Sequence, residues 1–389
     1  MIWIDKQRPL DQALEAVATQ PVVAVDTEAD SLHSYFDKVC LIQISAASDD
    51  LVIDPLAGVD LKRFGEVLAN PAITKILHGG DYDLRILNRD FGFVTTNLID
   101  TMICAQLLGY QAFGLAALLE RHFGVKVNKA HQRADWAMRP LTAAMLEYAA
   151  MDTRYLIALA QKLRDELTAL GRWGWAEEEF SRLETVRYRE TPDEEEGWRK
   201  IKNIGNLDRR SLAVLRDLHT WRDHLARNAD RPPFKIIGND AIVEIAKEKP
   251  QIIGDLSKLK SVSQYHRTRY GKAIIDTVKH AMSLAEADLP QRNEPRAWIR
   301  DKALEKRIDQ LKHVRDRIAK DLRLDPGVLA PKHVLSAVAT TGTLDVPAMR
   351  TWQRAVVGQA LLEVLSAIQR TEHCKMRAPW NAAPISKSS

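Results

Sequence analysis

Short apolar runs alternate with amphipathic stretches through residues 1–170 of this 389-residue chain. Three of the runs, Val22–Val25, Val39–Ala46 and Leu51–Ile53, are rich in β-branched and aliphatic residues and predict strands. Only short connections separate them, which favours an antiparallel meander. Two later runs, Ile73–Leu77 and Thr96–Ile99, are further candidate strands.

Helical spacing of apolar residues occurs between and after these runs. Leu61–Leu68 and Leu115–Phe123 each predict a helix, and Gly124 is placed to cap the second one. An Ala-, Leu- and Met-rich stretch from Leu141 to Leu156 predicts a third helix. Together the runs and helices predict an α/β domain with a mixed sheet.

A charged segment, residues 187–197, has few apolar side chains and predicts a linker. Beyond it the pattern is helical to about residue 370 and contains a faint repeat. Arg222-x3-Ala226 is followed 93 residues later by Arg315-x3-Ala319. The predicted bounds are 1–180 for the α/β domain, 181–206 for the linker, 207–288 and 294–372 for two all-α domains, and 376–389 for a disordered tail.

The two halves of the chain differ in charge. Residues 1–180 hold 17 Lys and Arg against 25 Asp and Glu, a net charge of −8. Subtraction from the whole-chain totals of 56 and 52 leaves 39 and 27 for residues 181–389, a net of +12. This asymmetry suggests that the first half holds cations and the second meets a polyanion such as nucleic acid. The alternative is that the basic helices are only well-solvated faces.

Several classes of protein are excluded. No uncharged apolar run approaches the roughly 20 residues that cross a bilayer, and the N-terminus lacks the long apolar segment of a signal peptide. Cys40, Cys104 and Cys374 are far apart, so the first two are predicted to be buried thiols in a cytoplasmic protein. A helicase is excluded because no Gly-x4-Gly-Lys-Ser/Thr loop is present.

Carboxylates form the candidate chemistry. Asp26 and Glu28 follow a strand and point to one face, because residues i and i+2 of a strand share a face. Tyr148 and Asp152 lie one turn apart on a predicted helix. Asp83 follows the run ending at His78, and the His-x4-Asp-Leu spacing favours it over Asp81. Clustered carboxylates repel one another, and divalent cations with oxygen ligands would relieve that repulsion.

These motifs, in this order, resemble those of the DEDD exonuclease family, in the subgroup whose third motif carries a tyrosine. One departure is Ala29, where the family usually has an aromatic residue after Asp-x-Glu. The two helical domains resemble HRDC domains, the first more closely than the second. Further segments that agree with the exonuclease family are Leu41-Ile42-Gln43-Ile44, Ile53-Asp54-Pro55-Leu56, Asp100-Thr101-Met102 and Asp135-Trp136-x2-Arg139-Pro140-Leu141.

The resemblance implies a ribonuclease H-like fold and a metal-dependent 3′→5′ exoribonuclease. It implies two ions, Mg²⁺ or Mn²⁺, with Asp26 bridging them, Glu28 and Asp152 completing the first site, and Asp83 holding the second ion through water. Tyr148 would orient the attacking water. Small structured RNAs, tRNA precursors above all, would be trimmed at their 3′ ends by a monomer, releasing nucleoside 5′-monophosphates.

Three questions stay open at this point. Trp136 and Arg139 are candidates for RNA contact, by stacking and at phosphate, but they could equally fix the loop against the catalytic helix. The substrate could also be DNA, because nothing in the sequence identifies a group that recognises the 2′-hydroxyl. A catalytically inactive RNA-binding protein is the third possibility, although all four carboxylates are present.

Overall fold

A computed structural model describes residues 1–46, 49–128, 130–189, 196–292 and 301–377. Its N-terminal domain is built on a six-stranded mixed sheet with the order β1-β4-β3-β2-β5-β6. The strands are β1 (Ile2–Ile4), β2 (Val22–Ala29), β3 (Val39–Ser45), β4 (Asp50–Ile53), β5 (Thr74–Leu77) and β6 (Leu98–Asp100).

The predicted meander is confirmed, since β2, β3 and β4 pair in antiparallel fashion. The other pairs, β1 with β4, β2 with β5 and β5 with β6, are parallel, so the sheet is mixed as predicted. The short edge strand β1 was not predicted. It precedes the first helix and adds only three residues to the sheet, too few for a clear alternation of apolar and polar positions.

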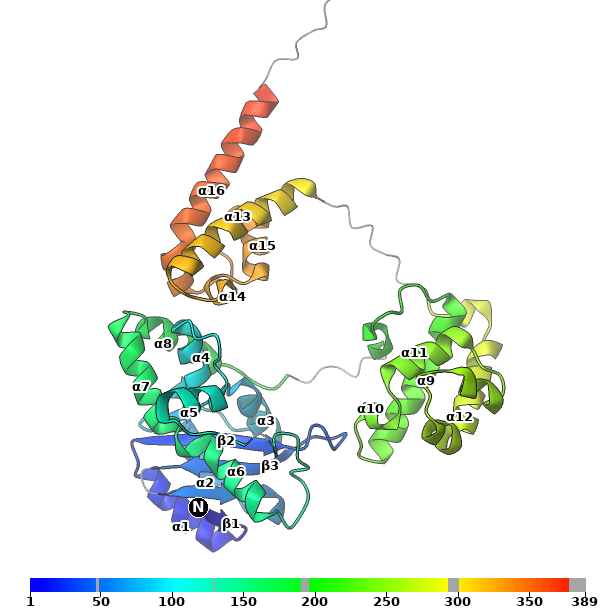
Figure 1. The fold of residues 1–389 in the computed structure, drawn as a ribbon, viewed down its shortest axis with the longest axis horizontal. Helices are drawn as coiled ribbons and strands as arrows, with labels where there is room; N and C mark the ends of the chain where they lie inside the picture. The colour runs from blue at the N-terminus through cyan, green and yellow to red at the C-terminus, as the bar shows by residue number, and fades with distance from the viewer. Residues whose placement is uncertain (47–48, 129, 190–195, 293–300, 378–389) are drawn as a thin grey trace, which may run out of the picture.

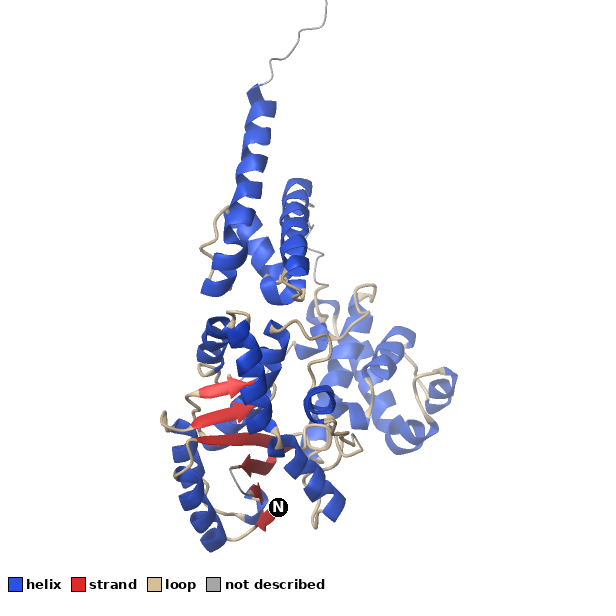
Figure 2. Cartoon of the chain, turned by 60° about the vertical axis from the view of Figure 1, so that its left-hand side comes forward, coloured by secondary structure: helices blue, strands red, loops and turns tan. Residues whose placement is uncertain are grey.

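Helices cover both faces of the sheet (Figure 2). One face, with Val23 and Val25 of β2, packs against α1 (Gln7–Ala18), α2 (Lys62–Ala69) and α3 (Asp81–Phe91). On the opposite face Ala24 and Leu41 contact the remaining helices of the domain. These are α4 (Thr101–Leu107), α5 (Leu115–Phe123), α6 (Ala143–Arg154), α7 (Leu156–Ala169) and α8 (Trp173–Leu183). A 3-10 turn, η1 (Pro55–Ala57), follows β4. Gly124 ends α5 in the left-handed conformation, φ 68°, as predicted.

The C-terminal half is helical and contains the predicted repeat. Its first domain comprises η2 (Gly197–Lys200), α9 (Arg209–Asn228), α10 (Pro233–Ile236), α11 (Asn239–Glu248), η3 (Ile253–Lys258), α12 (Gln264–Ser283) and η4 (Glu286–Asp288). Its second comprises α13 (Lys302–Asp321), α14 (Pro326–Leu329), α15 (Lys332–Thr341) and α16 (Thr351–Arg377). The first three helices of each domain start 93 residues apart, at Arg209 and Lys302, Pro233 and Pro326, and Asn239 and Lys332.

The repeat extends to a buried arginine in each domain. Arg222 donates to the carbonyl of Ile237, and Arg315 donates to the carbonyl of Ala330. Both guanidinium groups therefore tie the long first helix to the residue that follows the short second one. The faint sequence repeat thus marks a shared structural device, in which a buried cation satisfies helix-terminal carbonyls.

The second helical domain is continuous with the α/β domain. Trp352 of α16 stacks on Trp175 of α8, with ring centroids 4.8 Å apart, and its indole N–H donates to Glu179 at 2.9 Å. Gly109, at φ 81°, lies against the backbone of Arg323, where a Cβ would come within 1.9 Å of the carbonyl oxygen. The two parts share one hydrophobic core.

The first helical domain meets the α/β domain through the loop after β2 (Figure 1). Tyr35 donates its hydroxyl hydrogen to Asp223 at 2.8 Å, and its backbone N–H donates to Asp230 at 3.0 Å. Lys235 of α10 lies 3.1 Å from His33 Nδ1. This loop starts two residues after Glu28, so the contact adjoins the strand that carries the first acidic motif.

Some predicted bounds differ from the structure. Helix α8 continues to Leu183, past the predicted end of the domain at 180, and α16 continues to Arg377, so residues 376 and 377 are helical rather than part of a disordered tail. The rest of that tail, 378–389, lies outside the described residues. Cys40 and Cys104 are buried thiols, as predicted. Within the described ranges, no helix has the length and apolar character to cross a bilayer.

Candidate active site

Two elements bring three carboxylates together. Asp26 and Glu28 project from one face of β2, and Asp152 projects from α6, which crosses the same face. Side-chain oxygens of the three residues all lie within 4.8 Å of one another. Within the described parts of the chain, this is the one group of three or more His, Cys, Asp or Glu residues with metal-binding geometry.

Helix α6 is held over the sheet by polar contacts close to Asp152. The Thr153 hydroxyl lies 2.7 Å from that of Ser45 on β3. Arg154 donates to Asp50 on β4 at 2.6 Å and to Glu147 at 2.6 Å. These contacts fix the rotation of the helix, so that Asp152 faces β2.

Asp83 reaches the cluster from the other side. It is 8% exposed in the first turn of α3 and accepts a hydrogen bond from the Thr27 hydroxyl. It lies outside the group of three, although its charge acts on Asp26. Asp81, the other candidate in this motif, is exposed and paired with Arg85 at 2.7 Å. The structure therefore brings Asp83, and not Asp81, to the site.

The cluster has no cationic partner among the described side chains. No lysine, arginine or histidine in the described ranges forms an ion pair with Asp26, Glu28, Asp83 or Asp152. Burial raises the pKa of Asp26 well above its ordinary value, and the neighbouring carboxyls raise it further. Burial and the charges of Asp152 and Asp83 raise the pKa of Glu28 to about 9. Burial likewise raises the pKa of Asp152 to about 7 and that of Asp83 to about 6.

Other buried carboxylates near the site are neutralised by the protein. Asp54 forms a two-point ion pair with Arg139, at 2.7 and 2.6 Å. Asp30 pairs with Lys38 at 2.7 Å. Asp100 accepts four backbone N–H groups at the start of α4 and in the turn before α3. The four residues of the cluster are distinguished by having no lysine or arginine partner among the described residues, as expected of groups that bind a cation.

Tyr148 lies one turn before Asp152 and packs against Trp136, with ring centroids 6.0 Å apart. Burial raises the pKa of its phenol, and the charges of Asp152, Glu28 and Asp26 raise it further. The phenol therefore stays protonated at neutral pH. It can donate or accept a hydrogen bond beside the carboxylates, but it cannot act as a base.

The geometry favours a packing role for the two candidate RNA contacts. Trp136 is 1% exposed, so in this conformation its ring has no free face for a base. The guanidinium of Arg139 is occupied by Asp54 and by the carbonyls of Cys40 and Trp136. Both residues anchor the loop before α6 on β3 and β4, which is the alternative that the sequence left open.

Sequence reasoning assigned no role to one polar residue at this site. Gln43 of β3 is paired directly with Asp26 of β2 and has no exposed surface. The available signal was an amide inside the otherwise apolar run Val39–Ala46. His78 contacts the Thr101 hydroxyl through Nδ1 at 2.9 Å and belongs to no metal-binding group among the described residues.

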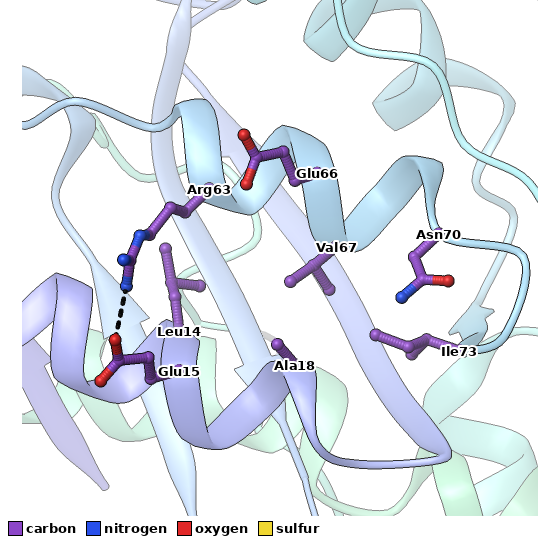
Figure 3. A pocket seen from close by; sticks show the side chains of 8 residues that line it. All are labelled: Leu14, Glu15, Ala18, Arg63, Glu66, Val67, Asn70 and Ile73. Atoms are coloured by element: carbon purple, nitrogen blue, oxygen red, sulfur yellow. Dashed lines mark hydrogen bonds and ion pairs between the residues drawn. The ribbon is translucent and has the colours of Figure 1, made fainter.

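A cavity of about 320 Å³ on the opposite face of the sheet offers no comparable chemistry (Figure 3). It lies between α1 and α2, and its lining residues include Leu14, Val67 and Glu66. Glu15 in this cavity is already paired with Arg63 at 3.1 Å. One of its two glutamates is thus neutralised, and among the described residues the cavity holds no group of three possible metal ligands, in contrast to the cluster around Asp26.

The donor set at the cluster fits a divalent cation. All four groups offer carboxylate oxygens, which are the ligands that Mg²⁺ and Mn²⁺ prefer. Three of them already lie at a mutual spacing that one ion could span. Cation binding would also offset the repulsion among these carboxylates. The site is therefore a candidate centre for a divalent metal.

Comparison with known proteins defines the class. Residues 1–168 match the family model described as 3′-5′ exonuclease, and residues 211–278 match that of the HRDC domain. The chain is thus an exonuclease domain followed by a helical region that includes an HRDC domain. From here on we call the first helical domain the HRDC domain.

Relatives over most of the length narrow the class to one family. Ribonuclease D of Escherichia coli K12 is 35% identical over 278 residues, 71% of this chain and 74% of the relative. Ribonuclease D of Granulibacter bethesdensis is 30% identical over 377 residues, 95% and 93% of the two chains. The crystal structure of Escherichia coli RNase D, described as an exoribonuclease involved in structured RNA processing, matches with a TM-score of 0.68 and 28% identity, covering 94% of this chain and 98% of that one. This chain belongs to the ribonuclease D family and is a 3′-5′ exoribonuclease.

The raised carboxyl pKa values predict how the metal-free protein responds to pH. A carboxyl whose pKa is higher in the folded than in the unfolded state stabilises the fold below its unfolded pKa, and that contribution is lost as pH rises through the folded value. With EDTA, the melting temperature of wild type should therefore fall more than that of Asp26→Asn between about pH 5 and about pH 9. Excess Mg²⁺ should reduce this difference. Parallel pH profiles for the two proteins in EDTA would contradict the electrostatic account of the cluster.

Proposed function

We propose that this protein trims the 3′ ends of small structured RNAs, tRNA precursors above all, by two-metal phosphodiester hydrolysis that releases nucleoside 5′-monophosphates. The observation that carries the proposal is the unpaired cluster of Asp26, Glu28, Asp83 and Asp152 on an exoribonuclease scaffold. Support for structured RNA comes from the relative in Escherichia coli, whose structure is described in those terms. The cytoplasmic location and the monomeric state stay predictions from the sequence.

Each residue of the cluster has a distinct proposed role. Asp26 is affected by the charges of all three other carboxyls, and it would supply oxygen ligands to both cations. Glu28 and Asp152 would complete one ion site, and Asp83 would serve the other through water. When bound, the cations would acidify the attacking water and stabilise the departing 3′ oxygen. The protonated Tyr148 phenol would orient that water by hydrogen bonding.

The basic half of the chain would capture the substrate. Residues 181–389 carry a net charge of +12, and the HRDC domain presents Arg231, Arg269 and Lys272 on its surface. Its contact with the loop after β2 connects it to the strand of Asp26 and Glu28. The second helical domain would have a structural role instead, since it shares a hydrophobic core with the exonuclease domain.

The activity is tested with a 3′-extended tRNA and a length-matched single-stranded DNA. Wild type should shorten the RNA from its 3′ end in Mg²⁺ or Mn²⁺ and release nucleoside 5′-monophosphates, and EDTA should stop it. Asp26→Asn keeps the size of the side chain but removes its charge, so the rate should fall by roughly 10³-fold or more. Wild-type turnover by Asp26→Asn would show that the site lies elsewhere. Faster digestion of the DNA would favour a DNA exonuclease instead.

Tyr148→Phe deletes only the hydroxyl and keeps the ring against Trp136. If the hydroxyl orients the attacking water, the single-turnover rate should fall roughly 10²-fold while Mn²⁺ affinity stays at the wild-type value. Tyr155→Phe is the matched control and should retain the rate. Tyr155 lies at the end of the same helix, and its ring packs on Phe123. Equal rates for Tyr148→Phe and wild type would remove this hydroxyl from the mechanism.

The capture role predicts a change in salt dependence. Phosphate contacts by Lys and Arg release counterions, so each lost contact should make the log–log plot of tRNA affinity against salt shallower by roughly 0.7 to 0.9. The triple variant Arg231→Ala, Arg269→Ala, Lys272→Ala should bind tRNA more weakly and with a shallower slope. A control triple variant removes Lys6, Arg8 and Lys62, exposed cations at the starts of α1 and α2, which cover the sheet face away from α6. Identical slopes for the two triple variants would leave the HRDC domain without a capture role.

A further inference from the structure

Gln43 is a buried amide without a visible structural purpose. It lies in the middle of β3 with no exposed surface, and neither its Oε1 nor its Nε2 has a hydrogen-bond partner among the described residues. Buried polar groups are nearly always paired, because an unpaired group loses its bonds to water and gains nothing in return. A methionine or leucine would fill this space without that cost.

The sheet register places this amide beside the carboxylate cluster. Gln43 is directly opposite Asp26 in the antiparallel pair of β3 and β2, and directly opposed residues point to the same face with Cβ atoms about 5 Å apart. The next pair along that face is Leu41 with Glu28. Helix α6, which carries Asp152, covers the same part of β3. The unpaired amide is therefore enclosed between the strand and the helix that supply the candidate ligands.

Asp26 has room for a further donor. An ionised carboxylate accepts at about four lone-pair positions, and two cations would use only part of that capacity. Asp26 accepts a hydrogen bond from the backbone of Thr27, and no side chain in the described ranges donates to it. An arginine or lysine here would neutralise the carboxylate and repel the cations. An amide supplies a donor and adds no charge.

We propose that Gln43 is a positioning residue for the metal centre, whose amide N–H donates to the ionised Asp26 carboxylate and fixes the direction of its oxygens. This rests on the proposed function, in which Asp26 contributes to both cations. Ligating carboxylates are commonly oriented by such hydrogen bonds, and losing the partner weakens metal affinity about 10- to 100-fold. The amide has no partner in the described parts of this structure, so the proposed hydrogen bond forms when Asp26 binds its cations.

The test measures Mn²⁺ binding and metal-free stability in the full-length protein. Gln43→Met replaces the amide by an apolar side chain of similar shape. We expect Mn²⁺ affinity, followed by the electron paramagnetic resonance of free Mn²⁺, to fall about 10- to 100-fold. The melting temperature in EDTA should equal or exceed that of wild type, because an unpaired amide has been removed. The exonuclease rate should recover at saturating Mn²⁺, with KM for RNA unchanged.

Ile44→Val is the matched control. Ile44 is the next residue of β3 and is fully buried on the opposite face of the sheet, in the core with α1 and α2. This variant should lose stability but keep the Mn²⁺ affinity of wild type. If Gln43→Met behaves in the same way, Gln43 has only a structural role and the proposal is overturned.

Two further variants keep the test decisive. Gln43→Leu serves the same purpose should Gln43→Met fold poorly. Asp26→Asn separates the two levels of the argument, because it should abolish tight Mn²⁺ binding if the proposed centre is correct. Unchanged Mn²⁺ affinity in Asp26→Asn would refute the centre itself. Loss of affinity in Asp26→Asn together with wild-type affinity in Gln43→Met would refute only the role of Gln43.

Discussion

Mutual repulsion among four carboxyl groups is the constraint on which the rest of this structure depends. Asp26, Glu28, Asp83 and Asp152 lie close together in a poorly solvated site, and none is paired with a protein cation within the described ranges. Without a counter-charge the ionised cluster is unfavourable: burial raises the pKa of all four carboxyls, and repulsion from neighbouring carboxyls raises those of Asp26 and Glu28 further. The fold must therefore hold in place groups that would otherwise move apart. This is why each carboxyl is attached to the sheet or to a helix fixed on the sheet.

The four carboxyls are carried by elements that are bonded to one another. Asp26 and Glu28 belong to β2, which has hydrogen-bonded neighbours on both sides. Asp83 is attached to that strand through Thr27, and Asp152 is held over it by the contacts of Thr153 and Arg154 with β3 and β4. A register shift between β2 and β3 lies at Glu28 and Ala29. The regular pairing ends there, at the start of the loop that contacts the HRDC domain. The strand of the metal centre and the contact to the capture domain are thus consecutive in the chain.

Local patterns in the sequence were sufficient for much of this arrangement. The apolar runs predicted β2 to β5 because each is bounded by polar residues, and the spacing i, i+2 and i, i+4 correctly placed Asp26 with Glu28 and Tyr148 near Asp152. The repeat was detectable because Arg222-x3-Ala226 and Arg315-x3-Ala319 share the same spacing 93 residues apart. By contrast, the packing of Trp352 on Trp175 depends on residues 177 positions apart, and no local pattern encodes it. The anchoring role of Arg139 depends on Asp54, 85 positions away, and the place of Gln43 beside Asp26 follows only from the sheet register.

The contrast between paired and unpaired carboxylates separates structure from chemistry in this domain. Asp54, Asp30 and Asp50 surround the site, and each has an arginine or lysine whose charge it neutralises. Because these pairs neutralise their own charges, the negative potential that a bound cation would meet comes from the cluster itself. An uncharged donor such as the Gln43 amide can orient one of these carboxylates without reducing that potential. The same acidic residue type thus holds the fold together where it has a cation of the protein, and provides a metal site where it has none.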